Sequence, residues 1–518
     1  MKKDKKIGSV LERKNIWEDS ILENIMQSTA ALRQQETKQY KVMPILFAML
    51  LSGFIGLFGE TALNVALTPL MGILEVGPTT IQWLTTGYLL VLGILVPVSG
   101  MLLQWFTTRQ LFTTSLLFSI AGTIVAALAG SFEILLVARV LQAIGTALLL
   151  PLMFNTILVI FPIEKRGAAM GLIGLVIMFA PASGPSISGL ILANLSWNWI
   201  FWISLPFFFI SIICGLLFLP NISEVTKPKI DIISIILSTL GFGGVVYGFS
   251  SAGGHGETGG GWSSPIVIIT MAIGILALLL FSVRQLKVKE PMMDLRAFKY
   301  PMFTVGLILI FICMMMMLSS MLIIPMYLQQ GLALSALTAG LVLLPGSLLN
   351  GFLSPVMGRL FDKFGPKWLV TIGLIVVSIV LFLYTGINPT TPLTMIIVMH
   401  IFMMIGISMI MMPAQTNGLN QLPPHFYPHG TAIMNTLQQV SGAIGTAVAV
   451  SILSAGQTRF LSGVADPKNP ESIIAGFTSG VQNAFIFALI LAIIGLVISF
   501  FLTRVKVDGS QEQHGPMH

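Results

Sequence analysis

The chain has 518 residues, of which 55% are hydrophobic and only 9% are charged, whereas about 25% of the residues of a soluble domain carry charge. This composition excludes a soluble protein and predicts an all-α membrane protein with many spans, because a membrane β-barrel would show only short alternating segments. The net charge of +7 does not indicate a nucleic-acid partner, because the positive residues lie in loops between apolar segments, where they set the topology.

The first 41 residues precede any long apolar segment and carry nine Lys or Arg and six Asp or Glu residues. They contain no apolar core of the kind found in a signal peptide. We expect residues 1–41 to form a cytoplasmic tail. The tail is either solvated or contains a short amphipathic helix at the membrane surface, since Ile21, Leu22, Ile25 and Met26 recur at helical spacing.

Fourteen segments are each long and apolar enough to cross the hydrocarbon core. They lie near 42–67, 79–103, 110–130, 133–159, 167–193, 197–219, 231–251, 264–283, 301–328, 334–358, 367–387, 392–414, 430–455 and 481–503. An even number places both termini on one side of the membrane. With that side taken as the cytoplasm, 24 of the 27 Lys and Arg residues lie inside, as the positive-inside rule requires.

The spans divide into two related halves. Gly100–Arg109 follows the second span as Gly358–Lys367 follows the tenth, and internal repeats of this kind are typical of secondary transporters. We therefore predict a six-helix half at 42–219, an inserted helix pair at 231–283, a second six-helix half at 301–503 and a cytoplasmic tail at 504–518. The Gly-rich stretch 250–264 between the inserted helices is interpreted as a flexible connector.

Glu60 lies inside the first span, where an ionised carboxylate costs at least about 2.5–3.5 kcal/mol. We interpret it as a proton-binding group; the alternative is a structural acid that only pairs with a base. Arg139 in span four lies at the same depth, about 10 Å below the outer face at 1.5 Å per residue, so the two residues can pair. Gln142 shares the face of Arg139 and would continue a polar strip inward.

Further polar residues occur in the second half. Asn435, Gln438 and Gln439 lie on one face of span thirteen. They could bind substrate or could equally hydrogen-bond between helices. His400 in span twelve could titrate, but an isolated histidine in a span more often bonds a neighbouring helix, so it ranks behind Glu60 as a coupling site.

Four motifs resemble the major facilitator superfamily, and within it the fourteen-span drug/proton antiporters of the QacA and EmrB type, a group of multidrug and lincomycin-type exporters. They are Glu60–Leu67, Arg139–Gly145, Gly171–Gly189 and the inside loop Gly358–Lys367. At the position of Glu60 that family usually has Asp. The first copy of the loop motif has Gln104 where the family carries Asp.

The resemblance implies the major facilitator fold and a role for each motif. Glu60 and Arg139 would couple transport to protons, and a substrate cavity would include Asn64, Gln142, Asn435, Gln438 and Gln439. Small residues and prolines permit close approach and bending of a gating helix, and the residues expected to act there and at the cytoplasmic gate are Pro181, Gly184, Pro185, Arg359, Asp362 and Lys363. The three charged ones are equally explained by the positive-inside rule alone.

These observations predict a proton-coupled antiporter that exports neutral, zwitterionic or weakly cationic amphipathic compounds across a bacterial-type cytoplasmic membrane. Export of an endogenous metabolite or lipid-like molecule is the alternative. We expect a monomer in the lipid bilayer, driven by the proton gradient, with no metal, no other cofactor and no nucleic-acid partner. An enzyme is disfavoured, because the six histidines offer only His425 and His429 close together, and Pro423, Pro424 and Pro428 argue against a helix there. A channel would lack the repeated halves.

Overall fold

The fold is taken from a computed structural model, which describes residues 42–505 apart from residues 77, 82, 223–224, 228–230, 254–260, 335, 465 and 468. The tails 1–41 and 506–518 and most of the Gly-rich connector lie outside the described residues. The predictions made for those stretches therefore stay predictions.

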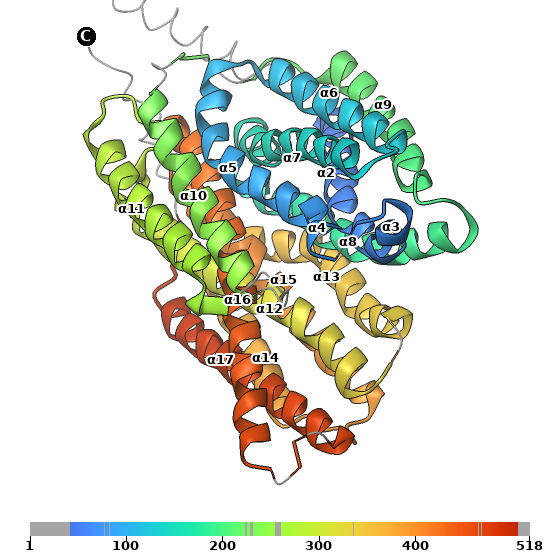
Figure 1. The fold of residues 1–518 in the computed structure, drawn as a ribbon. Helices are drawn as coiled ribbons and strands as arrows, with labels where there is room; N and C mark the ends of the chain where they lie inside the picture. The colour runs from blue at the N-terminus through green and yellow to red at the C-terminus, as the bar shows by residue number, and fades with distance from the viewer. Residues whose placement is uncertain are drawn as a thin grey trace, which may run out of the picture. The chain divides into compact units, whose positions relative to one another are not determined.

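The described chain is helical, with no strand among its residues (Figure 1). The first half contains α2 (Val42–Ala62), η1 (Leu63–Ala66), α3 (Leu67–Ile73), α4 (Pro78–Ile81), α5 (Trp83–Trp105), α6 (Thr108–Ala127), α7 (Phe132–Ile160), α8 (Ile163–Asn194) and α9 (Trp199–Phe218). The inserted pair is α10 (Ile232–Gly253) and α11 (Pro265–Lys287), with η2 (Gly261–Ser263) between them. The second half contains η3 (Leu295–Lys299), α12 (Pro301–Met326), η4 (Tyr327–Gly331), α13 (Ala336–Phe364), α14 (Pro366–Tyr384), α15 (Leu393–Asn420), η5 (Pro424–Phe426), α16 (Tyr427–Ser462) and α17 (Pro470–Ser499).

Each of the fourteen predicted spans coincides with a long helix. Among the described residues, thirteen helices are long and apolar enough to cross a membrane. The remaining predicted span, 167–193, lies in α8, which has 32 residues and is therefore long enough to cross as well. The protein is an all-α polytopic membrane protein.

Several helices extend beyond the predicted spans. The motif predicted as a loop at Gly358–Lys367 is helical up to Phe364, where Gly365 adopts a φ of +80° and ends α13. A positive φ is readily adopted by glycine, and Pro366 then starts α14 at the position that prolines favour. The predicted span at 481–503 begins earlier, at Pro470. Hydropathy detects the part of a helix within the hydrocarbon, whereas capping residues decide where the helix ends.

The two halves meet along two helix pairs. Helix α8 packs along α13, and α5 packs along α16, with further contacts between α7 and α16. The inserted helix α10 packs against both α5 and α16, so it lies over one of these two junctions (Figure 1). At one end of the bundle, α5 and α13 end and α8 and α16 begin. We call this end the basic end.

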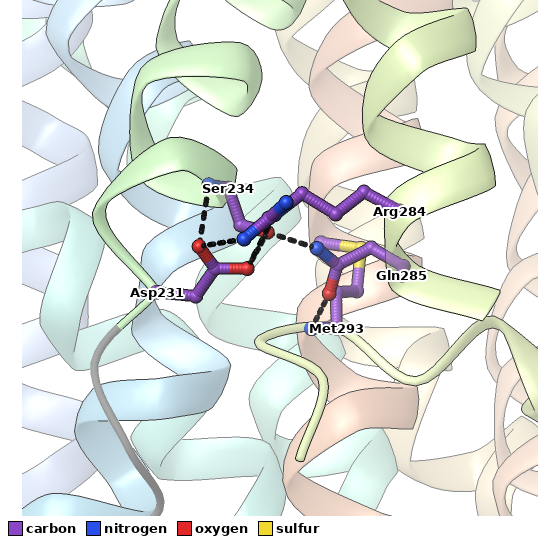
Figure 2. A network of polar contacts seen from close by, with 5 residues as sticks. All are labelled: Asp231, Ser234, Arg284, Gln285 and Met293. Atoms are coloured by element: carbon purple, nitrogen blue, oxygen red, sulfur yellow. Dashed lines mark hydrogen bonds and ion pairs between the residues drawn. The ribbon is translucent and has the colours of Figure 1, made fainter. Parts of the chain in front are cut away.

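A polar network fixes the inserted pair (Figure 2). The Arg284 guanidinium of α11 makes two bonds to the Asp231 carboxylate before α10, at 2.7 and 2.9 Å. The Gln285 amide donates to the Ser234 hydroxyl at 2.6 Å and its oxygen accepts from the backbone N–H of Met293 at 3.1 Å. The network therefore ties α10 and α11 together and also holds the segment that leads into α12.

The Asp231–Arg284 pair gives the protein a testable acid sensitivity. Hydrogen bonds from Arg284 lower the pKa of Asp231 to about 2, below the ordinary value of about 3.9 for the unfolded chain. The pair therefore stabilises the fold at and above pH 4, and this contribution is lost as the pH falls through about 2. D231N should reduce stability at pH 7 by about 1 kcal/mol or less, because Arg284 is partly exposed.

Thermal unfolding of the purified protein measures this effect. The difference between wild type and D231N should shrink between pH 4 and the lowest pH at which the protein stays folded. A difference that is constant over this range would contradict the assignment of the effect to the ionised carboxylate.

Candidate functional site

The first span changes its helical form just after Glu60. Helix α2 ends at Ala62 and continues as the 3₁₀ turn η1 before α3 begins at Leu67. A change from i→i−4 to i→i−3 bonding leaves main-chain carbonyls near the junction free to accept other donors. The carbonyls of Gly59 and Glu60 lie at this junction and accept hydrogen bonds from Arg139.

Arg139 is fully buried in α7, with an exposed fraction of 0%. Its Nε–H donates to the Leu84 carbonyl at 3.0 Å, one Nη to the Gly59 carbonyl at 2.9 Å and to the Gln142 amide oxygen at 3.0 Å, and the other Nη to the Glu60 carbonyl at 3.4 Å. Four of the five guanidinium N–H groups thus have acceptors in the described part of the chain. The rigid fork of an arginine suits this dispersed set.

Depth along the spans predicts that Glu60 and Arg139 meet, and the structure brings them together through the main chain of Glu60. Among the described residues, no ion pair within 4.0 Å joins the guanidinium to the Glu60 carboxylate. Glu60 as a whole residue is half-buried. Arg139 is therefore fixed independently of the Glu60 side chain, which leaves that side chain free to change its protonation and its partner.

Tyr88 on α5 is a member of this site that sequence reasoning missed. Its ring centroid lies 4.2 Å from the guanidinium carbon of Arg139, a cation–π contact. Its hydroxyl donates to the Thr146 hydroxyl at 2.8 Å. A tyrosine inside a membrane span is the signal that could have identified it, because its hydroxyl needs a partner when buried.

A cavity of about 20 Å³ lies next to the guanidinium, lined in part by Gly59, Tyr88, Arg139 and Gln142. That volume holds about one water molecule. The Gln142 amide also donates to the Thr123 hydroxyl of α6 at 3.2 Å. The predicted polar strip from Arg139 to Gln142 thus exists and continues to α6. The Asn64 side chain lies outside the described residues.

The predicted polar face of α16 is mostly buried. The Asn435 amide donates within its own helix to the Thr431 carbonyl at 2.8 Å, and Gln439 is half-buried. The Gln438 amide nitrogen has no hydrogen-bond partner in the described part of the chain, and on α7, which packs against α16, the same holds for the Asn155 amide oxygen. Buried polar atoms without partners are costly, so these two groups are available to a ligand or to water.

At the basic end, Asp362 of α13 joins the two halves. Its carboxylate accepts hydrogen bonds from the backbone N–H groups of Gly167 and Ala168, in the second turn of α8, at 3.0 and 2.9 Å. Arg359 and Lys363 are exposed and make no ion pair among the described residues. Of the three predicted gate charges, Asp362 is the one that the structure places across the junction between the halves.

Arg166 forms a second link across the same junction. From the sequence, this residue was counted only among the positive residues that set the topology. This buried side chain at the start of α8 donates to the Tyr427 hydroxyl at 3.0 Å and to the Asn420 amide oxygen at 3.3 Å. Both acceptors belong to the second half. Its guanidinium also lies 5.1 Å from the centroid of the Tyr427 ring.

The corresponding position between α5 and α16 has different chemistry. Gln104 replaces the expected acid and lies 3.4 Å from the ring nitrogen Nε2 of His429, while the backbone N–H of Asp294 donates to His429 Nδ1 at 3.3 Å. His429 lies in the first turn of α16, so the prediction that prolines exclude a helix there is wrong. Pro428 occupies the first turn, where its missing N–H costs nothing.

Glycines allow α8 and α13 to pack closely at the basic end. A Cβ on Gly167 would lie 2.3 Å from the Asp362 carboxylate and 2.5 Å from the Gly358 carbonyl, and a Cβ on Gly171 would lie 2.6 Å from Pro355 Cα. Toward the other end of α8, a Cβ on Gly189 would meet nothing within 4 Å. The two helices are therefore in backbone contact at the basic end.

G167A should slow transport by at least about fivefold, because overpacking of this kind costs about 1–3 kcal/mol in the state that is closed at the basic end. G189A adds the same methyl group to the same helix in open space and serves as the matched control. Transport assays in membrane vesicles compare the two variants. Equal rates for G167A and G189A would contradict a functional role for this contact.

The remaining predicted residues, Pro181, Gly184 and Pro185, lie on α8 in the part that faces α2. The Thr61 hydroxyl donates to the Pro181 carbonyl at 2.9 Å. A Cβ on Gly184 would lie 2.2 Å from the same hydroxyl. The proline-rich part of α8 is thus in direct contact with the residue next to Glu60.

Comparison with known proteins shows the family. The Major Facilitator Superfamily matches residues 49–446. The chain is 65% identical over 484 residues to the lincomycin resistance protein LmrB of Bacillus subtilis, covering 93% of this chain and 100% of that protein, and 62% identical over 477 residues to LmrB of Listeria innocua, covering 92% and 100%.

Solved structures show the same fold at low sequence identity. The human organic anion transporter MFSD10 superposes with a TM-score of 0.61 at 14% identity, covering 89% of this chain and 100% of that chain. The proton:xylose symporter XylE gives a TM-score of 0.60 at 13% identity, covering 89% and 96%. The chain belongs to the major facilitator superfamily.

Proposed function

We propose that this protein is a proton-coupled antiporter that exports neutral, zwitterionic or weakly cationic amphipathic compounds, lincomycin among them, across the cytoplasmic membrane. The observation that carries the proposal is the junction at Glu60, where an acid in a span adjoins a fully buried arginine. An ionisable residue in a span is a functional candidate by default. The choice of lincomycin rests on the names of the relatives that are 65% and 62% identical.

In this mechanism the basic end is the cytoplasmic end, as the distribution of Lys and Arg indicates. The contacts of Asp362 and Arg166 would keep that end closed, so we assign the structure to a state that is closed to the cytoplasm. A proton would bind Glu60 in this state and favour release of the substrate. Opening of the cytoplasmic end would then release the proton inside and admit the next substrate, which is alternating access between two halves.

The substrate would bind between the halves, where Gln438 and Asn155 have polar atoms without partners among the described residues. These groups would bond water or substrate during the cycle. The neutral amides of α16 provide no fixed charge, which suits substrates of low charge. Buried methionines, Met314 to Met317, lie on α12, which packs against α16, and they could adapt to varied apolar shapes.

Charge balance limits the net charge that an exported substrate can carry. If Glu60 alone carries coupling, one proton enters in each cycle, and the membrane potential supplies about 2.3 kcal/mol per 100 mV only for net charge moved. A neutral or zwitterionic substrate would use both the potential and the pH gradient. A monocation would use the pH gradient alone, and a dication would be exported against the potential.

Transport into everted membrane vesicles tests the proposal. Lincomycin and a set of analogues that differ only in charge would be added outside, and the pH gradient and the potential would be collapsed separately with nigericin and valinomycin. We expect collapse of the pH gradient alone to stop uptake of monocations, and only to reduce uptake of neutral and zwitterionic compounds, which the potential also drives. Uptake that persists when the pH gradient and the potential are both collapsed would overturn proton coupling, and absence of uptake of every compound would overturn drug export.

A further inference from the structure

The backbone of α8 contains a carbonyl that its own helix leaves without the usual donor. In an α-helix the carbonyl of residue i accepts from the N–H of residue i+4, and the residue four positions after Pro181 is Pro185. Proline has no N–H. The Pro181 carbonyl therefore needs a donor from elsewhere, since an unpaired carbonyl in a span is costly.

Thr61 supplies that donor from the other helix. Its hydroxyl lies 2.9 Å from the Pro181 carbonyl and 3.5 Å from the Phe58 carbonyl in its own helix. A hydroxyl has one proton to donate, and the shorter distance assigns that proton to Pro181. The bond joins residues that are 120 positions apart in sequence, so it is a tertiary link between the first span and α8.

Packing around this link leaves little freedom. A Cβ on Gly184 would lie 2.2 Å from the Thr61 hydroxyl oxygen and 3.1 Å from the backbone nitrogen of Ala62. Glycine at position 184 therefore lets α8 approach the turn that carries Glu60. The same turn is held on its other side by Arg139, which donates to the Gly59 and Glu60 carbonyls.

We propose that Thr61 is a positioning residue that couples Glu60 to α8, through its hydrogen bond to the carbonyl left open by Pro185. A change at Glu60 on protonation moves the turn, and the link passes that movement to the proline-containing part of α8. Helix α8 in turn packs along α13 of the other half. This inference rests on the proposed function, because it presumes that Glu60 binds the proton.

Two substitutions of Thr61 distinguish the effect of its hydroxyl on transport from the effect of its shape. T61V keeps the volume and removes the donor, whereas T61S keeps the donor. We expect T61V to lower the maximal rate of pH-gradient-driven lincomycin uptake about three- to tenfold, the range that a hydrogen bond between spans supports. The KM for lincomycin should stay unchanged, and T61S should restore the rate. T458V, which removes an exposed hydroxyl bonded within its own helix, is the matched control.

A double-mutant cycle with P185A tests the mechanism. The P185A substitution would restore the N–H that the Pro181 carbonyl lacks, so T61V should cost much less in the P185A background than in the wild type. An equal loss in both backgrounds would overturn the link through Pro181. A T61S rate as low as that of T61V would overturn the role of the hydroxyl, even if P185A does not fold.

The two levels of the proposal fail in different ways. A wild-type protein without pH-gradient-driven uptake would overturn the proposed function, and the inference with it. Wild-type uptake together with a T61V rate equal to that of wild type and T458V would overturn the inference alone.

Discussion

E60Q should abolish accumulation driven by the pH gradient. Gln carries the same shape as a protonated Glu but cannot release a proton, so the variant cannot exchange protons for substrate at this site. A gradient of two pH units supplies about 2.7 kcal/mol per proton, equivalent to about a hundredfold in accumulation. Everted vesicles that accumulate lincomycin in response to an imposed pH gradient measure this loss.

E60D is the matched control for this experiment. It keeps a titratable carboxyl, and because Arg139 is held by main-chain carbonyls of Gly59 and Glu60, a shorter acid leaves the guanidinium in place. We expect E60D to retain gradient-driven accumulation. Undiminished accumulation by E60Q would reject Glu60 as the coupling residue, whatever the result for E60D.

R139K should lose both transport and stability. Lysine keeps the charge but has a single nitrogen with three donors and no planar fork, so it cannot reach all of the carbonyls of Gly59, Glu60 and Leu84 together with Gln142. Each buried carbonyl left without a partner costs about 1–3 kcal/mol. With at least one of these acceptors left unpaired by the substitution, we expect a loss of about 1 kcal/mol or more and transport close to background.

Thermal unfolding in detergent and vesicle transport measure the two effects of R139K. R459K makes the same exchange at an exposed arginine near the end of α16 and should behave as wild type. An R139K protein that unfolds at the wild-type temperature would show that the carbonyl contacts contribute little. Normal transport by such a protein would remove Arg139 from the mechanism.

Much of the fold could be predicted from hydropathy and charge, because the membrane restricts the chain to helices of a minimum length. The positions of all fourteen spans follow from that restriction. The ends of the helices do not, as α13 shows: its last turns carry Arg359, Asp362 and Lys363, which lower the hydropathy without breaking the helix. The end is set by Gly365 instead.

The site was predictable at the level of residue pairs but not of atoms. Counting residues along two spans places Glu60 and Arg139 at one depth, yet the contact depends on the 3₁₀ turn after Ala62, which has no signature in hydropathy. Arg166 was counted as a topology signal because its partners, Asn420 and Tyr427, come from the other half of the chain. Such contacts require the packing of the halves, which one sequence does not specify.

The anchoring of Arg139 on the main chain has a genetic consequence. Every residue provides a carbonyl, so no substitution at position 60 other than one that distorts the backbone removes the acceptor for the guanidinium. Glu and Asp are encoded by triplets that differ in one base, and the route between them passes through no other residue. Lineages could therefore exchange the two acids here in a single mutational step while the arginine stays in position.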